Sequence, residues 1–205
     1  MFDPTNGNIA YAALGGDSPG SMEGVFTSMD AGQTWIPANG ASSTTLPLTN
    51  ASRIVLALAP ARPTTLYVSL ANVITGGLLG FFKTTDGGTT WTPLTTIRDY
   101  CRPLCDYANV IAVHPTNPDV VYAGGGAGTA LARSFDGGAT WSTLRSDEFG
   151  GVLHPDTHAL AFSSDGGKLY IGNDGGVYST MDIRCKTRKY RIKGQNATSA
   201  GCTKP

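Results

Sequence analysis

The sequence predicts an all-β protein, and more specifically a β-propeller, from three observations. The chain has 205 residues with 27 glycines, 12 prolines and only 15% charged residues, which favours a turn-rich globular protein over a helical or disordered one. One eight-residue phrase occurs three times, at Ser28–Trp35, Thr84–Trp91 and Ser134–Trp141. Short apolar runs bounded by Gly, Pro, Asn or Asp precede each phrase, as expected for β-strands.

The repeating unit is about fifty residues long and contains three ordered phrases. The aspartates of the eight-residue phrase are 56 and 50 residues apart, at Asp30, Asp86 and Asp136. An earlier phrase centres on a tyrosine, found at Tyr11, Tyr67, Tyr122 and Tyr170. A third phrase lies just ahead of the tyrosine phrase, in "RIVLALAP", "VIAVHP" and "HALAFSSD". Four-stranded sheets repeating at this period indicate propeller blades, in which radial repetition leaves only short, protected sheet edges. We therefore expect about four four-stranded blades that form part of a larger propeller.

The best-preserved unit shows how its strands follow one another. It predicts strands at 109–114, 120–124, 130–135 and 140–144, with turns rich in Pro, Asn, Asp or Gly between them. By the same phrases, the units run roughly over 1–40, 50–96, 107–146 and 156–183. The first unit lacks the innermost strand that the others show, and only about four units are present, so we expect the chain to be a piece of a larger propeller.

The C-terminal residues differ in character from the rest of the chain. Residues 1–183 contain eight Lys or Arg against fifteen Asp or Glu, a net charge of −7, whereas 184–205 contain seven basic residues and no acid. We therefore separate a propeller segment, 1–183, from a basic tail, 184–205, which a change of reading frame near Ile183 would explain. Because the propeller is acidic and the tail lacks an aromatic platform, no nucleic-acid partner is expected.

Turn formation accounts for the eight-residue phrase. The aspartate carboxylate accepts hydrogen bonds from N–H groups of its own turn, a glycine adopts positive φ, and the tryptophan packs back against the turn. Three aspartates in equivalent places are poor catalysts, because a catalytic pair needs two different environments. The predicted structural residues are Ser28, Asp30, Gly32, Trp35, Thr84, Asp86, Gly88, Trp91, Ser134, Asp136, Gly138 and Trp141.

These phrases resemble the Asp-box of BNR-type repeat proteins: Ser or Thr, any residue, Asp, any, Gly, any, Thr, Trp. That family includes sialidases, sortilin-type ectodomains, xyloglucan-degrading glycoside hydrolases and many secreted bacterial repeat proteins. The resemblance covers about residues 1–182 and implies a propeller whose boxes are structural and lie away from any active site. It also implies an extracellular or periplasmic protein, although no signal peptide is visible in the sequence.

Two relatives within this group are less favoured. No arginine stands in the Arg-Ile-Pro context of sialidases, so we exclude sialidase activity. A resemblance to photosystem assembly propellers predicts a basic patch, which the acidic residues 1–183 do not offer.

Candidate site residues gather in two phrases of the fourth unit, "HPDTHALAF" and "YIGNDGGVYST". The second is similar to the Asp-Gly-Gly segments at which xyloglucan-degrading propellers carry a catalytic carboxylate. Asp174 is therefore the candidate catalytic acid or base, with Asp156 as its partner, because glycoside hydrolysis needs two carboxylates. The alternative is that residues 173–176 form only a hairpin turn.

The remaining candidates are expected to bind a ligand rather than a metal. On an extended strand His154, Asp156 and His158 share one side; the alternative is a loop that enters the innermost strand, with Asp156 capping a turn after Pro155. Asn173 is expected with them at the central mouth of the propeller, which the inner strands and their loops line. Two histidines without a third strong ligand are a weak donor set, so we expect no metal and no cofactor. Cys101 and Cys105 are candidates for a disulfide in an exported protein, with reduced thiols as the alternative.

The sequence favours the hypothesis that the chain is part of a non-catalytic scaffold of an extracellular or periplasmic bacterial protein, which binds a polysaccharide or a protein. The alternative is a glycoside hydrolase of the xyloglucan-degrading type that acts on a polysaccharide through Asp174. No run of about eighteen apolar residues indicates a membrane span. Open edges of a partial propeller also favour self-association.

Overall fold

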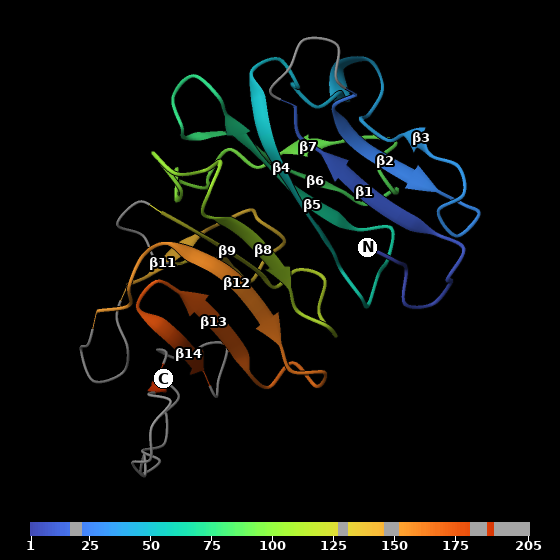
Figure 1. The fold of residues 1–205 in the computed structure, drawn as a ribbon. Helices are drawn as coiled ribbons and strands as arrows, with labels where there is room; N and C mark the ends of the chain where they lie inside the picture. Colours follow the sequence, from blue (N-terminus) through green and yellow to red (C-terminus); the bar gives the residue numbers. More distant parts are fainter. Residues whose placement is uncertain (17–21, 127–130, 146–151, 181–187, 191–205) are drawn as a thin grey trace.

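The strands form four antiparallel sheets that follow one another along the chain (Figure 1). The computed structural model describes residues 1–16, 22–126, 131–145 and 152–180, together with the backbone of 188–190. The one helical element in these residues is the short 3-10 helix η1 (Ser42–Thr44). The predicted all-β fold, a partial β-propeller, is confirmed.

The order of strands within each sheet is the order along the chain. The first sheet contains β1 (Ala10–Leu14), β2 (Gly24–Ser28) and β3 (Ile36–Pro37). The second contains β4 (Ala51–Leu58), β5 (Leu66–Asn72), β6 (Leu78–Thr84) and β7 (Thr92–Pro93). The third contains β8 (Asn109–Val113), β9 (Val121–Gly125), β10 (Leu131–Ser134) and β11 (Ser142–Leu144). The fourth contains β12 (Thr157–Phe162), β13 (Leu169–Asn173), β14 (Gly176–Thr180) and β15 (Arg188–Tyr190).

The first and fourth sheets differ from the second and third sheets. In the first, an isolated bridge between Phe2 and Ala10 stands where the other sheets have an inner strand. In the fourth, the outer strand β15 comes from the residues that we expected to form the tail, and its backbone pairs with β14. The rest of the predicted tail lies outside the described residues.

An apolar core fills the space between each pair of neighbouring sheets. Strand β5 shows why: Leu66, Val68 and Leu70 belong to the core shared with the first sheet. Its alternate residues Tyr67 and Ala71 belong to the core shared with the third sheet. Successive side chains of a strand point to opposite faces, so a blade buried on both faces is apolar at consecutive positions. A third core joins the third and fourth sheets.

The three repeated turns share one set of hydrogen bonds. In the first, the Ser28 hydroxyl donates to Asp30 at 2.8 Å and accepts the N–H of Gly32 at 2.8 Å. The Asp30 carboxylate also accepts the N–H of Thr34 at 2.8 Å and its hydroxyl at 2.5 Å. The turns around Asp86 and Asp136 repeat these contacts. Each carboxylate is thus occupied by its own turn.

These hydrogen bonds stabilise the ionised form of each aspartate. Bonds from Thr34 lower the pKa of Asp30 from its ordinary value of 3.8 to about 2. Bonds from Thr140 lower the pKa of Asp136 to about 2. At Asp86 burial raises the pKa, but the bonds of its turn outweigh burial and lower the pKa overall. A folded-state pKa below the unfolded value stabilises the protein above that value, and this contribution is lost as the pH falls through the folded pKa.

We therefore predict an acid-dependent loss of stability that originates in these turns. The wild type should melt at a higher temperature than the D30N/D86N/D136N variant when the pH is above 3.8, the ordinary pKa. The difference in melting temperature should shrink as the pH falls towards about 2, because the wild-type carboxylates become protonated. Circular dichroism melts over this pH range measure it. A difference that stays constant with pH would show that the charges of the turns contribute nothing.

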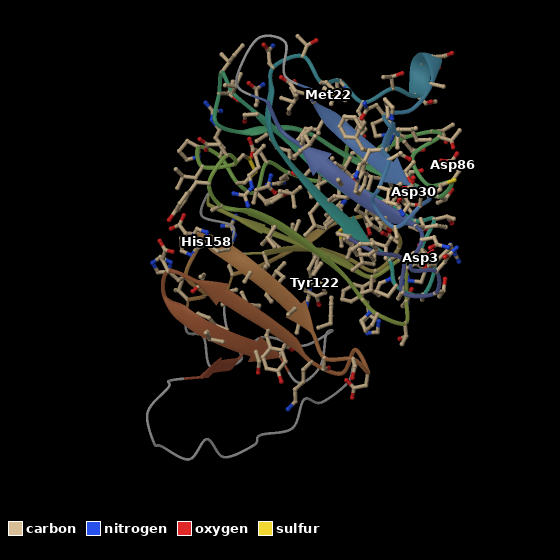
Figure 2. The ribbon with its side chains drawn as sticks, turned by 45° about the vertical axis from the view of Figure 1, so that its right-hand side comes forward. Asp3, Met22, Asp30, Asp86, Tyr122 and His158 are labelled. Carbon is tan, nitrogen blue, oxygen red and sulfur yellow. A yellow bond between two sulfur atoms is a disulfide. The ribbon has the colours of Figure 1, made fainter. Side chains whose placement is uncertain are left out.

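The sheets have two ends with different roles. We call the end at which β4, β8 and β12 begin the mouth end, and the end with the three repeated turns the turn end. Figure 2 shows His158 on one side of the molecule and Asp3, Asp30 and Asp86 on the opposite side. The carboxylates at the turn end are held by their own turns, whereas the mouth end presents polar side chains from several segments.

Candidate functional site

Four separate segments meet at the mouth end: the start of β4, the connection before β8, the start of β12 and the turn between β13 and β14. Arg53, near the start of β4, donates from Nη1 to the carbonyl oxygen of Tyr107 at 2.9 Å and to that of Asp106 at 3.3 Å. The Tyr107 ring lies edge-on to the imidazole of His158, with ring centroids 4.9 Å apart. The Tyr107 side chain is 61% exposed. Arg53 therefore positions the loop that presents an aromatic ring to solvent.

The imidazole of His158 connects this loop to the turn between β13 and β14. His158 Nε2 lies 2.9 Å from Asp174 Oδ1, and both side chains reach solvent. The pairing of β12 with β13 shifts register between Thr157 and Ala159, so His158 is the extra residue of a β-bulge. Bulges re-aim side chains at the ends of strands. We define Arg53, Tyr107, His158 and Asp174 as the mouth cluster.

The other predicted binding residues hold the surrounding loops. Asn173 ends β13, and its Nδ2 donates to the carbonyl oxygen of His154 at 2.8 Å. Its Oδ1 accepts the N–H of Gly175 at 3.0 Å, which closes the predicted hairpin turn. The Nδ1 atom of His154 lies 2.9 Å from the carbonyl oxygen of Pro155. The side chain of Asn173 therefore ties the loop of His154 to the hairpin turn that follows β13. These hydrogen bonds do not involve the mouth cluster.

The expectation that His154, Asp156 and His158 lie on one side of an extended strand is wrong. Asp156 has φ 57°, a left-handed conformation that breaks the alternation of an extended chain. Its side chain lies close to Gly126, next to the end of β9. A Cβ atom built on Gly126 would be 3.4 Å from the Oδ1 atom of Asp156. The chain can adopt this turn because the aspartate side chain is short and polar.

The predicted cysteine pair forms a disulfide between Cys101 and Cys105, with Cα atoms 4.6 Å apart. Asp99 lies next to it and accepts the N–H of Arg102 at 3.0 Å and that of Leu78 at 3.1 Å. These three residues, Asp99, Cys101 and Cys105, are the one group of three potential metal-ligating side chains within the described ranges. Because disulfide sulfurs are not thiolates, this group does not make a metal site.

Sequence reasoning missed two members of the mouth cluster, Arg53 and Tyr107. Tyr107 belongs to no repeated phrase and comes from the long connection between the second and third sheets. Arg53 opens the innermost repeated phrase of its unit, as His158 does in the fourth unit. A signal was nevertheless available, because the repeat aligns the start of β4 with that of β12. Residues near these starts are brought together by the fold, whatever their distance in sequence.

The mouth cluster has the chemistry of a polar binding surface. The guanidinium of Arg53 donates hydrogen bonds, the carboxylate of Asp174 accepts them, and the imidazole of His158 has a nitrogen for either role. The exposed ring of Tyr107 adds an apolar face with a polar hydroxyl. Together these groups suit a ligand that carries many hydroxyl groups on a partly apolar framework, as sugars do.

Comparisons with known proteins identify the fold. The structure is similar to a GH74 enzyme of Niastella koreensis, with a TM-score of 0.63 and 21% identity over 91% of this chain and 28% of that one. It is also similar to the GH74 xyloglucanase of Xanthomonas campestris, with a TM-score of 0.60 and 18% identity over 90% of this chain and 28% of that one.

A third similar structure is an ancestral GH74 enzyme, with a TM-score of 0.58 and 19% identity over 88% of this chain and 22% of that one. The chain thus spans about a quarter of the length of these enzymes. No protein-family model and no curated protein matches the sequence. The described residues include no helix with the length and apolar character needed to cross a membrane.

Proposed function

We propose that the chain is part of a non-catalytic β-propeller that binds a polysaccharide at its mouth end. The observation that carries this proposal is the mouth cluster, in which an exposed tyrosine ring lies beside an imidazole, a carboxylate and a guanidinium. The structural similarity to GH74 enzymes supports the fold that presents this surface. Because one fold hosts many activities, the fold does not identify the ligand. The chemical groups of the mouth cluster indicate the ligand class.

The glycoside hydrolase alternative depends on Asp174 and Asp156. Hydrolysis needs two carboxylates that flank the glycosidic bond, one as acid and one as base or nucleophile. In the described residues Asp174 faces the imidazole of His158, and Asp156 lies against Gly126. These separate contacts of the two carboxylates favour ligand binding over hydrolysis. One experiment with β-glucan oligosaccharides tests both functions.

Binding is tested with soluble β-glucan oligosaccharides and the full chain. We expect the Tyr107→Ala variant to raise the dissociation constant about tenfold, or ~1.4 kcal/mol, because it removes the exposed ring. The matched control is Tyr170→Ala, which removes a ring that is 44% exposed and lies outside the mouth cluster. Isothermal titration calorimetry measures both variants against the wild type.

Two results would contradict the proposal. The first is that no β-glucan binds, or that Tyr107→Ala binds as the wild type does. The second is release of reducing sugars that the Asp174→Asn variant abolishes, which would establish the glycoside hydrolase alternative. Binding without release, weakened by Tyr107→Ala and unchanged by Tyr170→Ala, supports a binding scaffold.

The finer features of the chain are proposed with this function. We propose that the three repeated turns are Asp-boxes, because their hydroxyl, carboxylate and glycine contacts are shared. We also propose the unit boundaries given by the repeat, and export to an extracellular or periplasmic location. The disulfide between Cys101 and Cys105 supports export, because such bonds persist in oxidising compartments.

A further inference from the structure

A second surface, separate from the mouth cluster, carries features that the repeat does not explain. A groove of about 360 Å³ lies between the outer strand β11 and the segment that follows β7. Trp141, Thr143 and Arg145 line one side, and Thr96 and Arg98 line the other. We call these five residues the lateral groove. Its volume lies within the range of about 300–1,000 Å³ that is typical of ligand pockets.

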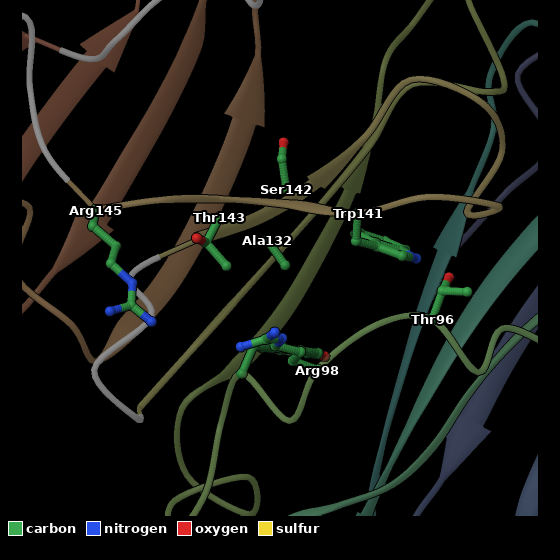
Figure 3. A pocket seen from close by; sticks show the side chains of 8 residues that line it. Thr96, Arg98, Ala132, Trp141, Ser142, Thr143 and Arg145 are labelled. Carbon is green, nitrogen blue, oxygen red and sulfur yellow. The ribbon is translucent and has the colours of Figure 1, made fainter.

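Both arginines line this groove. Figure 3 shows Arg145 and Arg98 below Thr143, with Trp141 and Thr96 towards the other end of the groove. Within the described part of the chain, neither guanidinium has a hydrogen bond or an ion pair. The acidic neighbour Asp99 is occupied by the backbone N–H groups of Leu78 and Arg102. The groove therefore offers two cationic groups that the described residues leave available.

The opposite end of the groove is rigid and partly apolar. The indole of Trp141 donates from Nε1 to the carbonyl oxygen of Gly138 at 3.0 Å, and its ring packs edge-on against Phe81 at 5.3 Å. Thr96 donates from its hydroxyl to the carbonyl oxygen of Ala139 at 2.9 Å. These contacts hold both sides of the groove in place before any ligand arrives, which lowers the entropic cost of binding.

Arg145 is a departure from the repeat. It lies four residues after Trp141, and the residues at that distance from Trp91 and Trp35 are Thr95 and Asn39. A side chain that the fold requires recurs at the equivalent place in other units, as the tryptophan itself does. Arg145 does not recur, so the architecture of the blade gives no reason for its charge.

From this arrangement we propose that the lateral groove binds an acidic oligosaccharide through a uronic acid residue. Arginines form paired hydrogen bonds with carboxylates, and two of them fix both the position and the orientation of the group. The exposed part of the Trp141 ring suits the apolar face of a sugar. The Thr143 hydroxyl can donate or accept a hydrogen bond, and the Thr96 hydroxyl, which donates to Ala139, can accept one. Because the propeller segment has a net charge of −7, attraction for an anion comes from these arginines rather than from the whole surface.

The probe for this site is a short homogalacturonan oligosaccharide, titrated into the full chain by calorimetry. We expect Arg98→Gln and Arg145→Gln each to weaken binding about tenfold, and the double variant to abolish measurable binding. Arg62→Gln is the matched control, because Arg62 is an exposed arginine outside the groove. The same oligosaccharide with its carboxylates reduced to alcohols should not bind, and added salt should weaken binding.

The outcomes separate this site from the mouth cluster. Tyr107→Ala should leave binding of the acidic oligosaccharide unchanged. The proposal for the lateral groove and the proposal for the mouth cluster are therefore tested independently of each other. The proposal is overturned if the wild type does not bind the probe, or if both arginine variants bind it as the wild type does. It is also overturned if sulfate alone binds as tightly as the oligosaccharide. Circular dichroism melts of each variant check that it is folded under the conditions of the titration.

Discussion

Replacing Trp91 with alanine is expected to lower the free energy of unfolding by about 3–5 kcal/mol, the usual cost of removing a buried aromatic side chain. The Trp91 ring is only 2% exposed and lies in the core between the first and second sheets. Its Nε1 donates to the carbonyl oxygen of Ala38 in the preceding unit at 2.9 Å. The substitution therefore leaves both a cavity and an unsatisfied buried carbonyl at the contact between two blades.

The chain supplies a matched control for this substitution in Trp35. It occupies the same place in the first repeated turn, but its side chain is 41% exposed and its Nε1 donates within its own turn, to Gly32. Trp35→Ala should cost about 1 kcal/mol or less, as expected for a largely exposed residue. Urea unfolding curves measure both variants. Equal losses would show that the tryptophan stabilises its own turn rather than the contact between sheets.

Much of the fold was predictable because the same local turn pattern recurs in several units of the sequence. Each repeated turn needs a hydroxyl, a carboxylate and a glycine at fixed spacing, and the sequence shows them at Ser28, Asp30 and Gly32. The strands of the third unit begin or end only one or two residues from the predicted positions, as at β8 and β9. Local hydrogen bonds and alternating burial are properties that a sequence displays directly.

Properties that depend on the neighbouring blade were not predictable from the phrase. The three tryptophans occupy the same position of the repeated phrase, yet Trp91 is buried and Trp35 is exposed, because the adjacent sheet determines which side chains lie beside each of them. The backbone of β15 is a further example. A basic sequence without the repeated phrase still pairs with β14, since backbone hydrogen bonds do not require particular side chains.

The candidate site was predictable only in part, for a related reason. Asp174 stood out because the Asn-Asp-Gly-Gly turn is a local pattern. Its contact with His158, and the contact of His158 with Tyr107, join segments that no local pattern connects. For Asp156 the sequence left two interpretations open, a shared side with the histidines or a turn after Pro155, and its left-handed conformation excludes the first. The lateral groove is formed between two sheets and was not foreseen.

A second large effect is expected when Gly88 is replaced with alanine. Gly88 has φ +93°, and a Cβ on it would lie 2.7 Å from the carbonyl oxygen of Ala38 and 2.9 Å from its Cβ. That carbonyl is the acceptor for Trp91, so relieving the clash by moving Ala38 also weakens the bond between the sheets. We expect a loss of about 3 kcal/mol in the free energy of unfolding, which combines backbone strain with overpacking.

Gly32 separates these two causes, because it occupies the same place in the first turn with φ +90°. A Cβ there would meet only the Trp35 ring, at the ordinary contact distance of 3.6 Å. Gly32→Ala should therefore cost about 1–2 kcal/mol from backbone strain alone. Urea unfolding of the two variants measures the difference, which reports on the contact between the first and second sheets. If Gly32→Ala costs as much as Gly88→Ala, strain within the turn accounts for both, and the close approach of Ala38 has no measurable effect.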